Sequence, residues 1–224
     1  MSTPDHTERV IEQVEQGASA SPRHDDIIHL VAKEGELKVE VRAFPVPTYD
    51  KRIHVGLLGQ NMSAHVLPLF SLQTMTDSEI NLTKKVSKLT RESANRKLPT
   101  INVVLDYNRF NLHFMLSVMI VTLSSLDAFF GLRVSFRDLH QWFQRCVLIG
   151  GSRTRSPRIA SDGLPEEGPY YHRRHEGGLE GMGQKIWTLV AQLLIRYSIV
   201  LCGLRGSIIG QGDNQVIVLR LTKD

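Results

Sequence analysis

A short stretch late in the sequence decides the fold: Ser207-Ile208-Ile209-Gly210-Gln211-Gly212-Asp213-Asn214-Gln215-Val216-Ile217-Val218-Leu219. Two apolar, largely β-branched runs flank a turn that is rich in glycine, aspartate and asparagine. This pattern predicts a β-hairpin, because those residue types favour strands and tight turns respectively. The predicted hairpin carries one acid, Asp213, at its tip.

A second acid also ends a predicted strand. The run Ile101-Asn102-Val103-Val104-Leu105 is typical of a short buried strand and stops at Asp106. Either acid taken alone is more often a solvated turn or cap residue. If the two strands lie side by side in one sheet, however, both carboxylates emerge at the same end and can share divalent cations. Mg²⁺ suits such a site because it takes carboxylates together with substrate phosphate oxygens.

Between the two acids lies a glycine-rich segment, His175-Glu176-Gly177-Gly178-Leu179-Glu180-Gly181-Met182-Gly183-Gln184-Lys185-Ile186-Trp187-Thr188. Four glycines in seven residues allow close backbone approach, and the N-terminus of the helix that follows favours anionic groups. Glu180 and Gln184 share a helix face four residues apart. The segment is either a nucleotide-reading surface or a plain glycine-rich start of a helix.

Other segments are assigned from periodicity and capping signals. Thr76-Asp77-Ser78-Glu79 has the form of a capping box and predicts a helix over 77–93. Further helices are expected at 113–126, 136–149 and from 181 or 182 to 201. Alternating residues at 37–41, within 29–44, suit a strand or an extended arm. Any helix in the polar residues 1–24 is expected to be short and weakly anchored.

Composition narrows the class of protein. The chain has 224 residues, a formal charge of +4 and 42% hydrophobic residues, which is typical of a globular protein. Cys146 and Cys202 show neither metal-site spacing nor a disulfide framework, so an intracellular setting is expected. Residues 1–8 show no secretion signal. The apolar stretches 114–126 and 186–204 are interpreted as buried helices, so we expect no membrane span.

Taken together, these motifs resemble the large (L) polymerase proteins of non-segmented negative-strand RNA viruses, the Mononegavirales. The segment 177–188 resembles their motif B, and Gln211-Gly212-Asp213-Asn214-Gln215 resembles motif C, with its Gly-Asp-Asn. Asp106-Tyr107-Asn108-Arg109-Phe110-Asn111 resembles motif A. Residues 33–44, with Lys33, Lys38 and Arg42, resemble the upstream basic motif of the fingers. The four motifs follow the family order and cover about residues 29–221.

The resemblance implies roles for particular residues. Asp106 and Asp213 would be catalytic and hold Mg²⁺ or Mn²⁺, with the Tyr107 carbonyl as a further ligand. Lys33, Lys38 and Arg42 would meet the incoming triphosphate, although solvated charges at a strand edge are their alternative interpretation. Asn214 would tune the metal site. Five residues of motif B would shape the nucleotide and template pocket: Gly177, Gly178, Glu180, Gln184 and Lys185.

The fold expected from this resemblance is α+β, a right-hand polymerase palm with partial fingers, truncated after motif C. Residues 1–24 would be a flexible leader, 25–100 a fingers-like region with the basic upstream motif, and 101–224 the palm with motifs A, B and C.

The expected reaction is template-directed RNA synthesis by two-metal nucleotidyl transfer. RNA template and nucleoside triphosphates would be its partners, and the family adds a phosphoprotein cofactor and a nucleoprotein. Virion and host cytoplasm are the expected locations, with the host nucleus as an alternative.

Two other functions are considered. An endogenised viral remnant would be non-catalytic and would bind RNA or a polymerase cofactor. A generic two-metal nuclease is a weaker hypothesis, because motif B has no role in it.

Overall fold

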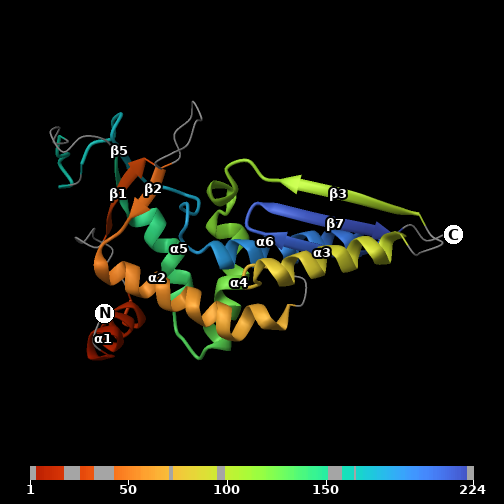
Figure 1. Ribbon diagram of the computed structural model, residues 1–224. Coiled ribbons are helices and arrows are strands. Elements are labelled where there is room, and N and C mark those ends of the chain that lie inside the picture. The colour runs from red at the N-terminus through yellow and green to blue at the C-terminus, as the bar shows by residue number, and fades with distance from the viewer. Residues whose placement is uncertain are drawn as a thin grey trace. The chain divides into compact units, whose positions relative to one another are not determined.

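The computed structural model describes residues 4–17, 26–32, 43–70, 73–94, 99–150, 158–163 and 165–220 of a mixed α/β protein (Figure 1). These residues belong to two compact units, each built from two separate parts of the chain. Residues 1–58 and 111–183 form the first unit, and residues 59–110 and 184–224 form the second. The predicted division into fingers-like and palm regions stays a prediction.

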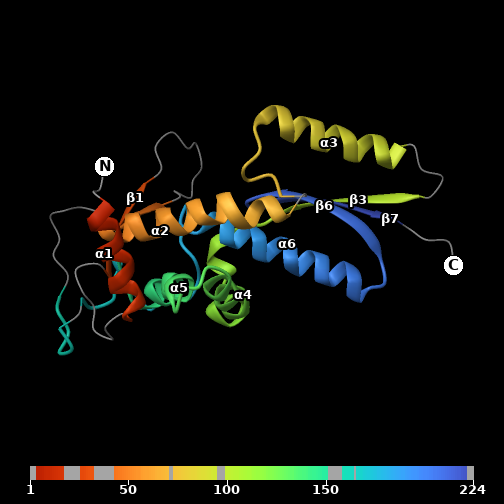
Figure 2. The same cartoon turned by 90° about the horizontal axis from the view of Figure 1, so that it is seen from below.

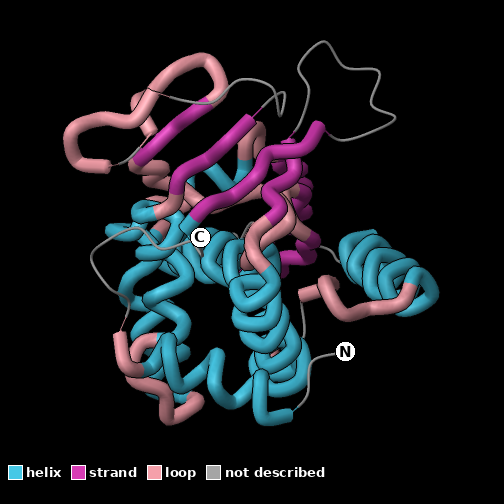
Figure 3. Tube along the Cα trace, turned by 90° about the vertical axis from the view of Figure 1, so that its left-hand side faces the viewer, coloured by secondary structure: helices cyan, strands magenta, loops and turns pink. Residues whose placement is uncertain are grey.

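The first unit contains a four-stranded sheet in the order β2-β1-β4-β5. Its strands are β1 (Ile27–Ala32), β2 (Ala43–Val46), β4 (Val147–Gly150) and β5 (Tyr171–Arg173). Parallel pairing joins β1 to β4, and the two outer pairs are antiparallel. Figure 3 shows the strands of both sheets in magenta.

Four helices belong to this unit, namely α1 (Pro4–Glu15), α2 (Tyr49–Asn61, up to Leu58), α4 (Leu116–Phe129) and α5 (Ser135–Arg145). The interior is apolar, with Met119 and Leu123 of α4 and Phe136, Trp142 and Phe143 of α5 fully buried. Beside them the buried ammonium of Lys51 lies 3.2 Å from the Asp138 carboxylate and above the Trp142 ring. The ion pair compensates two charges that would otherwise be costly to bury.

One predicted helix was wrong in its last four residues. The helix expected over 136–149 ends at Arg145, and Val147–Gly150 forms strand β4. The run Val147-Leu148-Ile149 is apolar and fits either element by periodicity. Its parallel pairing with Ile27–Leu30 supplies the hydrogen bonds that select the strand.

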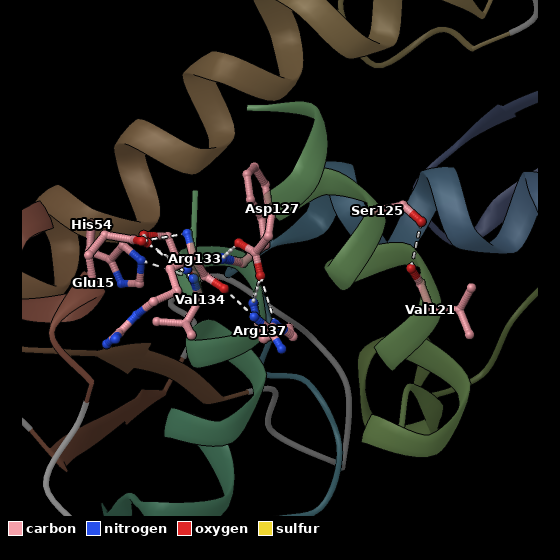
Figure 4. A network of polar contacts seen from close by, with 10 residues as sticks. Glu15, His54, Val121, Ser125, Asp127, Arg133, Val134 and Arg137 are labelled. Atoms are coloured by element: carbon pink, nitrogen blue, oxygen red, sulfur yellow. Dashed lines mark hydrogen bonds and ion pairs between the residues drawn. The ribbon is translucent and has the colours of Figure 1, made fainter. Parts of the chain in front are cut away.

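The start of α5 is held by two carboxylates from other helices (Figure 4). Glu15 of α1 accepts hydrogen bonds from the main-chain N–H and the hydroxyl of Ser135. Asp127 of α4 accepts the N–H of Phe136 at 2.7 Å and pairs with Arg137 at 3.0 Å. Negative charge is favourable at a helix N-terminus. The N-terminal helix is therefore longer and better anchored than its sequence suggests, with Val10 and Val14 buried as well.

The second unit is built on a three-stranded antiparallel sheet in the order β3-β7-β6. Its strands are β3 (Thr100–Asp106), β6 (Arg205–Gln211) and β7 (Asn214–Arg220). Helices α3 (Glu79–Ala94) and α6 (Gln184–Leu201) lie on opposite sides of this sheet (Figure 2). The α6 side forms an apolar core of Ile195, Ile208 and Ile217. The hairpin and the strand that ends at Asp106 are therefore confirmed, but β3 was expected to be buried and is largely exposed, because it is an edge strand of the sheet.

The remaining elements of this unit are short or begin later than predicted. The end of α2 continues into a π-helix (Met62–Val66) and a 3-10 helix (Leu67–Leu69). A further 3-10 helix, Phe110–His113, begins at the last residue of this part of the unit and continues into the first unit. Helix α3 starts at Glu79, where the Ser78 oxygen accepts the Asn81 N–H. Thr76, the predicted cap, instead accepts a hydrogen bond from the Gln73 side chain. None of the helices in the described ranges is long and apolar enough to cross a membrane.

Candidate active site

The two predicted catalytic acids lie at neighbouring positions at one end of the three-stranded sheet, where β3 ends and β7 begins. Asp106, the last residue of β3, pairs in register with Asn214, the first residue of β7. Asp213 directly precedes Asn214 in the turn between β6 and β7. The Tyr107 N–H extends the ladder by donating to the Asp213 carbonyl oxygen at 3.1 Å. The register thus brings together two carboxylate-bearing residues that stand far apart in the sequence.

The surroundings of these carboxylates fit a divalent cation. Asp106 is exposed and Asp213 is partly exposed, so both are accessible to ions and phosphates. Asn214 donates from Nδ2 to Oδ1 of Asp213 at 3.1 Å, which restrains the side-chain rotation of the aspartate. Among the described residues, no basic side chain forms an ion pair with either carboxylate, and no cluster of three or more His, Cys, Asp or Glu is placed to hold a metal. Two carboxylates completed by phosphate oxygens are a usual ligand set for Mg²⁺.

The turn that carries Asp213 has an unusually constrained backbone. Gly212 adopts a left-handed φ of +61°, and a Cβ at this position would lie 2.8 Å from Nε2 of Gln184. Gln215 is fully buried and donates from Nε2 to the Gly212 carbonyl at 2.9 Å. Its side chain fills the space beside Gly210, where a Cβ would lie 1.6 Å from the Gln215 Oε1. Gln215 was expected in the turn, with no role, and is instead the second residue of β7.

The glycine-rich part of motif B contacts the end of motif A within the first unit. The Gly178 N–H donates to the Asn111 carbonyl at 2.8 Å, and the Asn111 Nδ2 donates to the Glu180 carboxylate at 2.7 Å. Gly177 packs so tightly that a Cβ would lie 2.2 Å from the Leu112 carbonyl oxygen. Gly177 is therefore required by close backbone approach. Asn111, for which no role was predicted, joins the two motifs.

Gln184 and Lys185, the last two of the five motif B residues, are the first two residues of helix α6 in the second unit. Gln184 is its first residue and lies against Gly212, while its Oε1 is buried without a hydrogen-bond partner. Lys185 donates from Nζ to the Gly59 carbonyl at 3.1 Å and to the Ser63 hydroxyl. Its ammonium thus stabilises the π-helical end of α2 in this structure.

The predicted triphosphate-binding residues Lys33, Lys38 and Arg42 lie outside the described residues. Their roles stay predictions.

Tyr107, whose carbonyl is the expected further ligand, lies within the described residues. Its ring lies 5.6 Å from the Phe110 ring, and burial raises the pKa of its hydroxyl.

Comparison with known proteins gives a consistent result over nearly the whole chain. Residues 8–222 match the family model described as Mononegavirales RNA dependent RNA polymerase. The large structural protein of Mokola virus is 33% identical over 216 residues, which is 92% of this chain and 10% of that protein. The RNA-directed RNA polymerase L of European bat lyssavirus 2 is 34% identical over 205 residues, which is 88% of this chain and 10% of that protein. The chain spans about a tenth of the length of the curated relatives that it matches.

Proposed function

Because this chain belongs to the RNA-dependent RNA polymerase family of the Mononegavirales, we propose that it is a segment of the catalytic core, a polymerase palm with part of the fingers. In the proposed reaction an RNA 3′ hydroxyl attacks the α-phosphate of a nucleoside triphosphate, directed by an RNA template, and pyrophosphate leaves. The observation that supports this most directly is the β3–β7 register, which sets Asp106 beside Asn214 and next to Asp213.

The two aspartates and Asn214 have different roles in the proposed reaction. Asp106 and Asp213 would hold Mg²⁺ or Mn²⁺. Asn214 would keep the Asp213 carboxylate in one orientation through its 3.1 Å hydrogen bond. The bound cations would polarise the attacking hydroxyl and neutralise charge on the triphosphate. An acid pair with no competing basic partner among the described residues leaves its negative charge available for this.

Nucleotide and template binding are assigned to motif B and to the upstream basic residues. Gly177, Gly178 and Glu180 would form a backbone-lined surface, held by Asn111. Gln184 would place a polar side chain beside the Asp213 turn. Lys185 would act by fixing the start of α6 to the end of α2. Lys33, Lys38 and Arg42 would stabilise the triphosphate charge, as fixed cations do in phosphoryl transfer.

The family also implies protein partners and a location for the complete polymerase. A phosphoprotein cofactor and a nucleoprotein-coated template would assemble with the complete polymerase in the virion and the host cytoplasm. We infer these partners from the family alone.

The test is nucleotide incorporation by a full-length L protein that contains this segment. Asp213→Asn keeps the shape of the side chain and removes its charge, so we expect incorporation to fall by at least about a hundredfold. Asp162→Asn is the matched control, because Asp162 is an exposed acid paired with Arg173 at 2.9 Å. Full incorporation by Asp213→Asn would overturn the proposal. A different result would favour the alternative function, a non-catalytic protein that binds RNA. In that case the unmodified protein incorporates no nucleotide and Asp213→Asn still binds RNA normally.

A further inference from the structure

We propose that Thr74 and Gln192 are positioning residues for the Asp213 turn and act through the carbonyl group of Gly210. Neither residue belongs to a motif that the sequence analysis selected. The importance of the turn rests on the proposed function, in which Asp213 holds a catalytic cation. The geometric part of the inference, that these two side chains fix the turn, can be tested separately.

Three donors converge on a single main-chain oxygen. The Gly210 carbonyl accepts the Thr74 hydroxyl at 2.8 Å, the Thr74 N–H at 3.3 Å and the Gln192 Nε2 at 3.2 Å. Thr74 is 1% exposed and Gln192 is 7% exposed. Hydrogen bonds in such a buried setting are stronger than at the surface, so removing one donor weakens the restraint on this carbonyl.

The position of this carbonyl explains why it needs external donors. Strand β6 is an edge of the sheet, so its outward carbonyls have no strand partner. At Gly210 the edge is instead covered by a parallel bridge with Gln73. The end of β6 is thereby held from the segment before α3 and from α6 together.

The constraint passes from Gly210 to Asp213 through Gln215. The Gln215 side chain occupies the space that a Cβ on Gly210 would need, and its Nε2 holds the Gly212 carbonyl. A shift of Gly210 therefore displaces Gln215 and releases the residue directly before Asp213. Gln184 closes the other side of Gly212.

The segment that carries Thr74 is itself fixed to α3. Lys85 donates from Nζ to the Gln73 carbonyl at 2.8 Å and pairs with Asp77 at 2.6 Å. The Gln73 side chain also binds the Thr76 hydroxyl and the Met75 N–H, both at 2.9 Å. Thr74 is therefore presented by a rigid support, as a positioning residue must be.

The test compares Thr74→Val, Thr74→Ser and Gln192→Leu in this chain. Valine keeps the β-branched shape and removes the hydroxyl, whereas serine retains the donor. Thr83→Val is the matched control, because the Thr83 hydroxyl also donates to a main-chain carbonyl, that of Glu79 at 2.8 Å, on the exposed surface of α3. The measurements are hydrogen exchange of the individual amides at 210–216 and the dissociation constant for Mn²⁺.

We expect Thr74→Val and Gln192→Leu each to accelerate exchange in the turn by about tenfold or more while the amides of β3 far from the turn keep their rates. We also expect the Mn²⁺ dissociation constant to rise at least about threefold. Thr74→Ser should restore both values, and Thr83→Val should change neither.

Three results have distinct meanings. Unchanged exchange in the turn, or an equal acceleration across the whole sheet, overturns the inference. If Thr74→Val does not fold, Gln192→Leu decides by the same criteria. If exchange responds as expected but the unmodified chain binds no Mn²⁺ through Asp213, the proposed function fails and the positioning of the turn stands.

Discussion

Replacement of Gly177 by alanine tests the contact between the glycine-rich segment and the end of motif A. The new Cβ would lie 2.2 Å from the Leu112 carbonyl oxygen, and 2.7 and 2.8 Å from the Leu112 carbonyl carbon and Cα. All three are main-chain atoms, so no side-chain rotation relieves the clash. Reaching an ordinary contact of 3.4 Å requires the two segments to separate by about 1.2 Å.

The expected loss in the free energy of unfolding follows from the contacts that this separation would break. The 2.8 Å hydrogen bond from the Gly178 N–H to the Asn111 carbonyl would be lost, which costs about 1 kcal/mol or more in a buried site. Overpacking adds about 1–3 kcal/mol. We therefore expect Gly177→Ala to lower the free energy of unfolding of the first unit by about 2–4 kcal/mol.

Urea unfolding followed by tryptophan fluorescence measures this loss. Trp142 lies in the first unit and Trp187 in the second, and both are fully buried. In a Trp187→Phe background, Trp142 reports the first unit alone. Gly56→Ala is the control, because nothing lies within 4 Å of a Cβ at that helical position, and it should raise stability by about 0.5–1 kcal/mol. An unfolding midpoint for Gly177→Ala equal to that of the control would refute the reasoning.

Three further predictions concern other constrained sites. Gly210→Ala places a Cβ 1.6 Å from the Gln215 Oε1, so the second unit should lose about 2–4 kcal/mol by Trp187 fluorescence; an unchanged midpoint contradicts this. Glu15→Ala removes the acceptor at the start of α5 and should cost about 1–2 kcal/mol in urea unfolding, whereas exposed Glu12→Ala should cost little. Burial, aided by the charge of Lys51, lowers the pKa of His54 to about 4 from 6.5. The unfolded chain therefore binds the extra proton between pH 6.5 and 4, and the free energy of unfolding should fall by up to about 3 kcal/mol as the pH drops through that range. His54→Gln should flatten this slope, and an unchanged slope would exclude His54 as its source.

Much of the second unit could be predicted because its signals are local. The β6–β7 hairpin follows from apolar runs around a turn sequence, and β3 from a β-branched run that ends at an acid. The site hypothesis required the strand before Asp106 and the strand before Asp213 to lie side by side in one sheet. They share a sheet, but β7 lies between β3 and β6. The β3–β7 register still sets Asp106 beside Asn214, the residue after Asp213.

The elements that could not be predicted depend on distant partners. Val147–Gly150 becomes a strand because β1 supplies its hydrogen bonds, and periodicity alone does not distinguish that run from a helix. The anchoring of α1 depends on Glu15 meeting the start of α5, far along the chain. Local pattern contains no information about either contact.

The same limit applies around the candidate site. Asp106 and Asp213 were selectable because each follows an apolar run, and the glycine-rich segment because of its composition. Thr74 and Gln192 lie in ordinary sequence and acquire meaning only when both meet the Gly210 carbonyl. Lys185 illustrates the converse, because its sequence position suggested a nucleotide pocket while its ammonium binds the Gly59 carbonyl in the structure.

Mn²⁺ titration of the chain, followed by electron paramagnetic resonance, tests the central claim that Asp106 and Asp213 together hold a divalent cation. The unmodified chain, Asp106→Asn, Asp213→Asn and the Asp162→Asn control would be titrated under the same conditions. We predict that each of the first two substitutions weakens Mn²⁺ binding by at least about tenfold and that the control leaves it unchanged. Equal affinity in all four proteins, or loss of binding in the control alone, would contradict the account.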